Sequence, residues 1–278
     1  MTIREALRLA AARLEQAGVP DADVDAAYLL ASVLKEDTLA MRINGHRELA
    51  APQRAAFDAL CDRRGAGEPL QYILGETEFM GLTFHVEPGV LIPRADTEIL
   101  VEKALEWMKP GARVLDIGTG SGAIAVSLAK LGRQAQVTAA DVSDRALEIA
   151  RQNAGRNGAA VEFVKSDCFS ALKGRKYDMI VSNPPYISED EMRGLMPEVT
   201  REPELALFGG ADGLDFYRRI SREAPEYLNE GGCLLFEIGW LQKDAVSALV
   251  KAHIGEPFAL RDYGQNWRVV GARKEGAC

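Results

Sequence analysis

The sequence is poor in the residues that build disulfide frameworks and metal sites. It has four cysteines in 278 residues, none of them in a CxxC pair, and three isolated histidines. The long gaps between Cys61, Cys168, Cys233 and Cys278 indicate reduced thiols. Because no cluster of His, Cys or carboxylate residues has the spacing of metal ligands, we expect no metal.

Other absences narrow the class of protein. No apolar run approaches the ~18 residues of a membrane span, and the N-terminus carries Arg4 and Glu5 where a signal peptide would be apolar. We therefore expect a cytoplasmic protein with no membrane partner. The net charge of −8 disfavours a direct nucleic-acid partner, because phosphate binding normally needs a basic face. Nothing in the sequence addresses the oligomeric state, and a monomer is the default expectation.

Residues 1–75 and residues 76–94 differ in the secondary structure that their sequence predicts. Residues 1–75 predict helices and no strand: Thr2 and Glu5 have capping-box spacing, and apolar residues recur at helical intervals. We predict a small all-α N-terminal domain here, which either has no chemistry of its own or docks a substrate. Residues 76–94 are rich in strand formers and are broken at two glycines, Gly81 and Gly89, which predicts a β-hairpin linker.

Residues 95–278 alternate between strand and helix patterns. The predicted strands are Arg113–Ile117, 136–140, Val161–Lys165, Tyr177–Ser182 and 233–238. The predicted helices are 96–109, Ala123–Leu131, Asp144–Asn157, 214–228 and 241–253. This order predicts an α/β domain with a parallel sheet covered on both faces. Two last strand runs, 258–262 and 267–272, predict a terminal hairpin at the edge of the sheet.

A glycine-rich turn follows the first strand of this domain, in residues 114–122 (VLDIGTGSG). Glycine permits close approach of the backbone to a ligand, and open α/β sheets bind ligands at this end of the strands. Asp141 follows the second strand, 19 residues past Gly122, where a carboxylate can accept both hydroxyl hydrogens of a ribose. The candidate cofactor-binding residues of the turn are Gly118, Thr119, Gly120, Ser121 and Gly122. The pattern alone fits a nicotinamide dinucleotide or S-adenosylmethionine.

The third strand is followed by Asp167 and Cys168. A carboxylate at Asp167 can accept a hydrogen bond from an adenine amino group, and the side chain of Cys168 can pack on the ring. A simple helix cap after the strand explains the same residues equally well.

The fourth strand ends in Asn183, Pro184, Pro185 and Tyr186. The two prolines fix two φ angles and extend the residue before them, so a stiff strand end presents the Asn183 side-chain oxygen and the Pro184 carbonyl. Two such acceptors can hold both N–H groups of a planar amide and stabilise positive charge that develops on its nitrogen. Tyr186 offers a flat wall for the planar group.

Together with residues 67–75 (GEPLQYILG), 90–98 (VLIPRADTE) and 207–217 (LFGGADGLDFY), these motifs resemble the HemK/PrmC family. This family comprises the N5-glutamine methyltransferases of peptide-chain release factors. The resemblance implies a class I S-adenosylmethionine-dependent methyltransferase fold: a Rossmann-like, mostly parallel seven-stranded sheet with a terminal antiparallel hairpin, plus the small all-α domain. It implies protein methylation in translation termination, with S-adenosylhomocysteine as the product.

The resemblance also assigns roles to residues. It implies cofactor contacts from Gly118 through Gly122, Asp141, position 168 and Asn183. It implies that residues 183–186 grip the glutamine of a Gly-Gly-Gln tripeptide in the release factor. Position 168 is often a large aromatic residue in this family, so Cys168 departs from the pattern and puts a stacking contact with adenine in doubt.

Four alternatives stay open. An adenine-N6 methyltransferase uses the same N-P-P-Y logic, although it must hold a polyanion and flip a base. A methyltransferase of a ribosomal-protein glutamine is a closer rival. A nicotinamide oxidoreductase fits the glycine turn but gives N-P-P-Y no role. A binding module with this fold and no turnover would bind the cofactor without transferring a methyl group.

Overall fold

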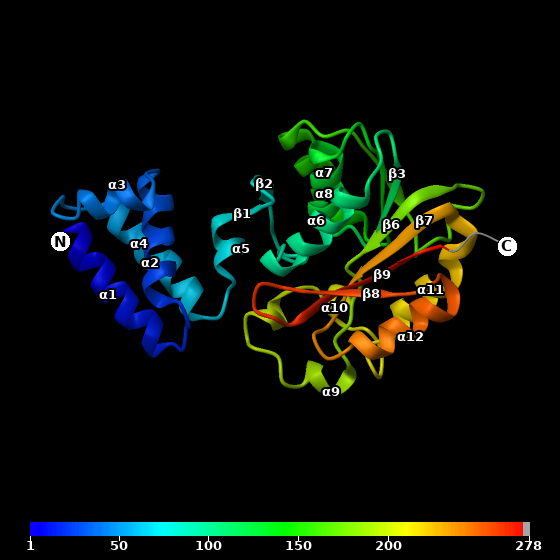
Figure 1. Ribbon diagram of the computed structural model, residues 1–278. Helices are drawn as coiled ribbons and strands as arrows, with labels where there is room; N and C mark the ends of the chain where they lie inside the picture. The colour runs from blue at the N-terminus through cyan, green and yellow to red at the C-terminus, as the bar shows by residue number, and fades with distance from the viewer. Residues whose placement is uncertain (275–278) are drawn as a thin grey trace. The chain divides into compact units, whose positions relative to one another are not determined.

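The computed structural model describes residues 1–274, and Cys278 lies outside them. The chain forms two compact units (Figure 1). One comprises Met1–Glu76 together with Met196–Arg201, and the other comprises Thr77–Leu195 together with the residues from Glu202 onward. No helix in the described part is long and apolar enough to cross a membrane.

The smaller unit is helical. Its helices are α1 (Ile3–Gln16), α2 (Ala22–Leu34), α3 (Thr38–Ile43), α4 (Ala51–Gly65) and α5 (Leu70–Leu74). The capping box predicted for Thr2 and Glu5 is present at the start of α1. The sequence pattern did not predict α3 or α5, which are only six and five residues long. Apolar side chains from α1, α2 and α4 form one core.

A buried ion-pair network lies in the same unit. Arg64 on α4 contacts Asp25 on α2 at 2.6 Å and Glu198 at 2.8 Å. Glu198 belongs to the segment Met196–Arg201, which includes the short 3-10 helix η2 (Val199–Arg201). Burial raises the pKa of Asp25, and the hydrogen bond from Arg64 opposes that rise. Residues far from the N-terminus in sequence therefore complete the helical unit.

The larger unit is built on a seven-stranded sheet with the order β5-β4-β3-β6-β7-β9-β8. The strands are β3 (Arg113–Ile117), β4 (Gln136–Asp141), β5 (Val161–Lys165), β6 (Tyr177–Ser182), β7 (Leu228–Glu237), β8 (Phe258–Arg261) and β9 (Trp267–Arg273). The first five run parallel, and β9 pairs antiparallel with both β7 and β8. This confirms the predicted mostly parallel sheet with a terminal antiparallel hairpin.

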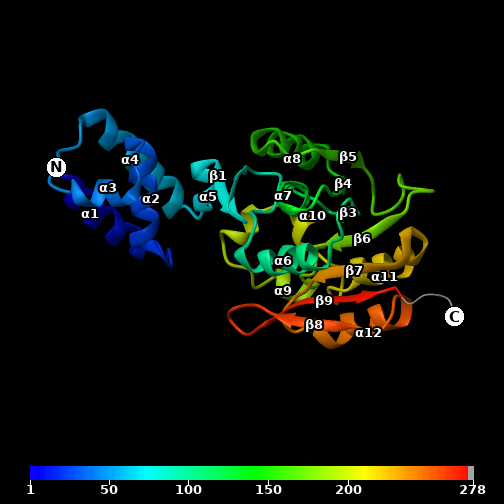
Figure 2. The ribbon, with the colours of Figure 1, turned by 45° about the horizontal axis from the view of Figure 1, so that its top comes forward.

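Two helical layers cover the sheet (Figures 1 and 2). Helices α6 (Glu98–Trp107) and α7 (Ala123–Leu131) pack on one face, with α8 (Asp144–Asn157) beside α7. Helices α11 (Asp215–Tyr227) and α12 (Lys243–His253) pack on the other face. Successive side chains of a strand point to opposite faces of the sheet and pack into different cores. Val114 lies in the core on the first face, and Leu115 lies in the core on the second.

Some predicted boundaries were wrong by a few residues. Strand β7 begins at Leu228, five residues before the predicted start at 233. The apolar pattern missed this part of the strand because Asn229 and Glu230 are polar. The helix predicted over 96–109 is split into the 3-10 helix η1 (Ala95–Thr97) and α6. Short helices α9 (Glu189–Met192) and α10 (Glu204–Leu207) interrupt the stretch between β6 and α11.

The predicted hairpin forms from β1 (Glu76–Phe79) and β2 (Leu82–His85). Side-chain hydrogen bonds join the hairpin to α8 of the larger unit. The Asn153 side chain accepts a hydrogen bond from the His85 N–H at 2.7 Å and donates to the His85 carbonyl at 3.0 Å. Phe79 and Phe84 enter the core of the larger unit.

Candidate active site

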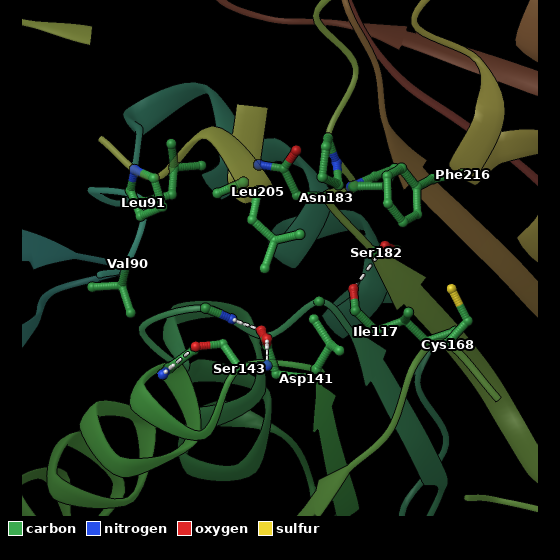
Figure 3. A pocket seen from close by; sticks show the side chains of 18 of the residues that line it. Val90, Leu91, Ile117, Asp141, Ser143, Cys168, Ser182, Asn183, Leu205 and Phe216 are labelled. Carbon is green, nitrogen blue, oxygen red and sulfur yellow. Dashed lines mark hydrogen bonds between the residues drawn. The ribbon is translucent and has the colours of Figure 1, made fainter. Parts of the chain in front are cut away.

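A cavity of about 320 Å³ lies at the carboxyl ends of β3, β4 and β6 (Figure 3). Open α/β sheets place ligands at this edge, and the volume is within the usual range for a small-molecule site. Eight predicted site residues line it: Gly118, Gly120, Asp141, Asp167, Cys168, Asn183, Pro184 and Pro185. Four others do not: Thr119, Ser121, Gly122 and Tyr186.

Asp141, at the end of β4, anchors the glycine turn. Its Oδ2 accepts a hydrogen bond from the Gly120 N–H at 2.9 Å, and its Oδ1 accepts one from the Ser143 N–H at 2.9 Å (Figure 3). Burial raises the pKa of Asp141, and the backbone N–H groups of Ser143, Gly120 and Val142 oppose that rise. A carboxylate has about four lone pairs, so Asp141 can still accept a further hydrogen bond from a ligand.

The turn residues that do not line the cavity support it from behind. Thr119 donates from its hydroxyl to Asp116 Oδ2 at 2.6 Å, and the Ser121 carbonyl accepts a hydrogen bond from Asn153. Gly122 lies against α8, where an added Cβ would meet the Ala150 Cβ at 3.0 Å. Close packing of the turn on the helix therefore requires glycine at this position.

Asp116 lies beneath the turn and is fully buried. Burial raises its pKa to about 7, the nearby charge of Asp141 adds to the rise, and the hydrogen bond from Thr119 opposes it. Its Oδ1 has no hydrogen-bond partner within residues 1–274. The Asp116 carboxyl group is therefore partly protonated near pH 7.

Cys168 and two side chains of α11 form one apolar wall. Phe216 and Ile220 line the cavity together with Cys168. The Cys168 backbone is left-handed, with φ of 48°, and its carbonyl accepts a hydrogen bond from the Ser166 hydroxyl at 2.7 Å. Burial raises the pKa of its thiol to about 11, so the side chain is a neutral, apolar contact surface.

Asp167 is exposed and paired with a cation. Arg219 contacts its Oδ1 at 2.6 Å and also donates to its backbone carbonyl at 3.0 Å. The pairing holds Asp167 at the cavity rim, where it remains among the lining residues.

The N-P-P-Y segment forms the opposite side of the cavity. Asn183, Pro184 and Pro185 line it, and the Asn183 Nδ2 donates to the Thr97 Oγ1 at 3.4 Å. Tyr186 turns away and packs among the core residues below β6 and β7. Burial raises the pKa of Tyr186 to about 12, with the charge of Glu237 adding to the rise, so it is a neutral phenol.

Residues 207–213 brace the N-P-P-Y segment from outside. The Ile187 N–H donates to the Leu207 carbonyl, and the Gly209 N–H donates to the Ile187 carbonyl. A Cβ on Gly209 would lie 2.7 Å from both the Pro185 carbonyl oxygen and the Tyr186 Cα. A side chain at 209 would therefore displace the segment that presents the Asn183 and Pro184 acceptors.

A second brace joins two segments of the chain that contribute to the cavity lining. Buried Glu202 accepts a hydrogen bond from the Ile92 N–H at 3.0 Å and pairs with Arg94. Residues 89–91 and 203–206, on either side of this brace, contribute lining residues. The motif at 90–98 and the Glu202-Pro203 dipeptide therefore meet in space.

Sequence reasoning missed most of the apolar lining. Val90, Leu91, Leu205, Phe216 and Ile220 all line the cavity. Their positions follow from loops and a helix face far from the glycine turn in sequence. The signal that could have found Val90 and Phe216 was their place inside the motifs 90–98 and 207–217.

The chain matches two family models. Residues 5–75 match the model described as PrmC N-terminal domain, and residues 82–201 match the model described as Methyltransferase small domain. A release factor glutamine methyltransferase of Geobacter sulfurreducens is 44% identical over 274 residues, covering 98% of this chain and 96% of that protein. A protein of the same name from Cereibacter sphaeroides is 43% identical over 281 residues, covering 100% of both.

Solved structures resemble the larger part of the chain. A methyltransferase from Pyrococcus furiosus matches with a TM-score of 0.55 at 24% identity, covering 71% of this chain and 91% of that one. A Thermus thermophilus 16S rRNA N2 G1207 methyltransferase, solved with AdoMet and guanosine, matches with a TM-score of 0.53 at 21% identity, covering 72% and 50%. At these identities the matches show the fold: that of class I methyltransferases.

Proposed function

Because the chain belongs to the family of release factor glutamine methyltransferases, we propose that its cavity binds S-adenosylmethionine and a glutamine side chain together. The reaction moves the methyl group to the side-chain nitrogen, N5, of the glutamine in a Gly-Gly-Gln motif of a peptide-chain release factor. One observation carries the proposal. Gly118 and Gly120 of the glycine turn, Asp141, and the residues Asn183, Pro184 and Pro185 line a single cavity at the ends of neighbouring strands.

The residues on the β3–β4 side suit the cofactor. S-adenosylmethionine supplies an electrophilic methyl group when it is bound. Gly118 and Gly120 have no side chain, and a Cβ on either would meet no atom within 4 Å, so the turn leaves room for a ligand. Asp141 keeps free lone pairs for the ribose hydroxyls. Val142, Cys168 and Phe216 offer apolar surface for the adenine ring.

The residues on the β6 side suit the acceptor. An amide nitrogen is a poor nucleophile because its lone pair is delocalised. The Asn183 oxygen and the Pro184 carbonyl would hold its two N–H groups and aim the nitrogen at the methyl group. The same two dipoles would stabilise the positive charge that grows on the nitrogen as the bond forms. The prolines and the brace at residues 207–213 fix the acceptors in advance, so little reorganisation is needed.

The helical unit would dock the protein substrate. Its helix α3 carries two large apolar side chains, Leu39 and Ile43, that are 67% and 70% exposed. They are four residues apart and therefore lie on one face of the helix. Exposed apolar side chains that lie together on one face can form part of a protein-binding surface. With a release factor as its partner, the enzyme would act in the cytoplasm, where translation ends.

The proposed function is tested by incubating the protein with tritiated S-adenosylmethionine and a release factor. A release factor whose Gly-Gly-Gln glutamine is changed to alanine serves as the control. Label on the first protein and none on the second supports the reaction and its target residue. Label on neither protein would withdraw the release factor as substrate and direct the search to ribosomal proteins and to adenine in nucleic acids. Equal label on both would place the methyl group on another residue.

A further inference from the structure

Two buried side chains lie behind Asn183 and do not line the cavity. Thr97 ends η1 and is 4% exposed, and Glu237 ends β7 and is 1% exposed. The Asn183 Nδ2 donates to the Thr97 Oγ1 at 3.4 Å. The Thr97 hydroxyl and the Asn183 side chain also lower the pKa of the buried Glu237 carboxyl group, so both lie beside it. The three side chains therefore form one connected group.

The chemistry of the three side chains determines which of them donates a hydrogen bond and which accepts one. An amide can turn either its NH₂ or its oxygen toward a neighbour, and a hydroxyl can donate or accept. An ionised carboxylate can only accept. Glu237 in that form takes the Thr97 hydroxyl hydrogen, so the Thr97 oxygen is left to accept from the Asn183 NH₂. The Asn183 oxygen then has no partner in this group and is available to a ligand.

We propose that Thr97 and Glu237 are positioning residues that hold the Asn183 side chain with its oxygen toward the acceptor glutamine. This inference rests on the proposed function and adds to it the residues that orient the Asn183 amide. It also gives a role to Thr97, a residue of the motif at 90–98 that does not itself line the cavity. The reverse orientation would present an NH₂ to the substrate NH₂, and the two donors would repel each other.

The ionisation state of Glu237 controls this orientation. Burial raises its pKa to about 7, and the charge of Asp96 adds to the rise, while Thr97, Arg268 and Asn183 oppose it. Arg268 on β9 pairs with Asp96 on η1 at 2.9 Å. Two tyrosines also lie beside Glu237. Tyr186 is a neutral phenol whose pKa the Glu237 charge raises, and the Tyr217 hydroxyl donates to the Glu237 backbone carbonyl at 3.0 Å. The Glu237 Oε2 has no hydrogen-bond partner within the described residues 1–274.

Protonation of Glu237 would exchange the donors and acceptors among these three side chains. A protonated carboxyl group can donate to Thr97, which then turns its own hydrogen toward Asn183 and favours the unproductive amide orientation. Turnover should therefore rise with pH through about 7 as Glu237 ionises.

The first test compares Thr97→Val with Thr97→Ser in the full-length enzyme, with a release factor as substrate. Val removes the hydroxyl, and kcat should fall about 10- to 100-fold, the usual effect of misplacing a reacting group. Ser keeps the hydroxyl and should restore kcat to within about threefold of the wild type. Calorimetry should show S-adenosylmethionine binding within about threefold of wild type for both, because neither side chain lines the cavity. Wild-type kcat in Thr97→Val would overturn the proposal.

The second test is the pH profile of kcat for wild type and Glu237→Gln, which has the same shape and no ionisable group. The wild type should lose activity below about pH 7, and the variant should show a lower and nearly flat profile across that range. The same acid limb in the variant would assign it to another group, such as Asp116, and overturn the proposal even if Thr97→Val fails to fold. An inactive wild-type enzyme would instead reject the proposed function itself.

Discussion

The Oδ2 atom of Asp141 accepts a hydrogen bond from the Gly120 N–H at 2.9 Å, so the carboxylate at the end of β4 holds the glycine turn at the end of β3. The group expected to bind ribose therefore also shapes the turn that lies beside it. A ligand that uses the remaining lone pairs of Asp141 meets a carboxylate already fixed by two backbone N–H groups. Preorganisation of this kind limits what the site loses in entropy when it binds.

Asp141→Asn should weaken S-adenosylmethionine binding by roughly 1–3 kcal/mol, the usual loss for a hydrogen bond to a charged group. Asn keeps an acceptor oxygen for one of the two backbone N–H groups, but its NH₂ faces the other, so urea unfolding is measured beside the affinity to show that the turn stays folded. Titration calorimetry measures the affinity. Asp144→Asn is a matched control, since that carboxylate is 77% exposed on the next helix and does not line the cavity. Equal affinity in Asp141→Asn and the control would remove Asp141 from the cofactor site.

Two glycines of the turn should separate folding from binding. Both have left-handed backbones, with φ of 54° at Gly120 and 83° at Gly122, so alanine costs about 1–2 kcal/mol of unfolding free energy at either. Gly122→Ala should lose roughly 1–3 kcal/mol more because its Cβ meets Ala150 at 3.0 Å. Gly120→Ala meets no protein atom but narrows the cavity.

Urea unfolding and calorimetry distinguish the two variants. Gly122→Ala should be the less stable, and Gly120→Ala should be the folded variant that binds S-adenosylmethionine at least about tenfold more weakly. Wild-type affinity in Gly120→Ala would mean that the ligand does not approach the turn at this residue.

Asp116→Asn should change how stability depends on pH. The folded-state pKa of Asp116 is raised to about 7, so its contribution to stability is complete below the unfolded-state pKa of about 4 and is lost as pH rises through 7. The variant lacks this contribution. The difference in unfolding free energy, wild type minus variant, should therefore fall by roughly 2–4 kcal/mol between about pH 4 and pH 8.

Urea unfolding of both proteins at several pH values measures that difference. Asp58→Asn, a change at an exposed carboxylate on α4, should track the wild type throughout. A constant difference between wild type and Asp116→Asn would show that Asp116 does not titrate in this range.

The double substitution Leu39→Ser, Ile43→Ser tests docking by the helical unit. Both side chains are exposed, so stability should change little, while KM for the intact release factor should rise about tenfold, corresponding to about 1.4 kcal/mol. The kcat at saturating release factor should not change, because the cavity is untouched. Leu131→Ser, at a half-exposed position of the larger unit, is the control. An unchanged kcat/KM in the double variant would leave α3 without a docking role.

The sequence predicted the regular elements of the larger unit well because each strand is a short apolar run bounded by turn residues. Arg113–Ile117, Val161–Lys165 and Tyr177–Ser182 were predicted with the bounds that the structure has. The helices Ala123–Leu131 and Asp144–Asn157 follow clear start signals, Gly122 and Ser143. Local pattern and tertiary structure agree at these segments.

The rest depends on contacts between distant residues. The short helix α3 is too brief for periodicity to reveal it. Met196–Arg201 joins the helical unit through contacts with residues far away in the sequence, such as the pairing of Glu198 with Arg64. Phe216 reaches the cavity from a helix that begins more than thirty residues after Asn183. Glu237 did leave a signal, since it is a charged residue inside an apolar strand, but its partner Thr97 could be found only in three dimensions.

The most direct measurement is tandem mass spectrometry of the release factor after incubation with S-adenosylmethionine and either the wild-type enzyme or Asn183→Ala. Both enzymes are first shown by calorimetry to be saturated with the cofactor. We predict a methyl group on the side-chain nitrogen of the Gly-Gly-Gln glutamine with the wild type, and none in the same time with Asn183→Ala. A methyl group at any other position, or equal methylation by Asn183→Ala, would contradict the account.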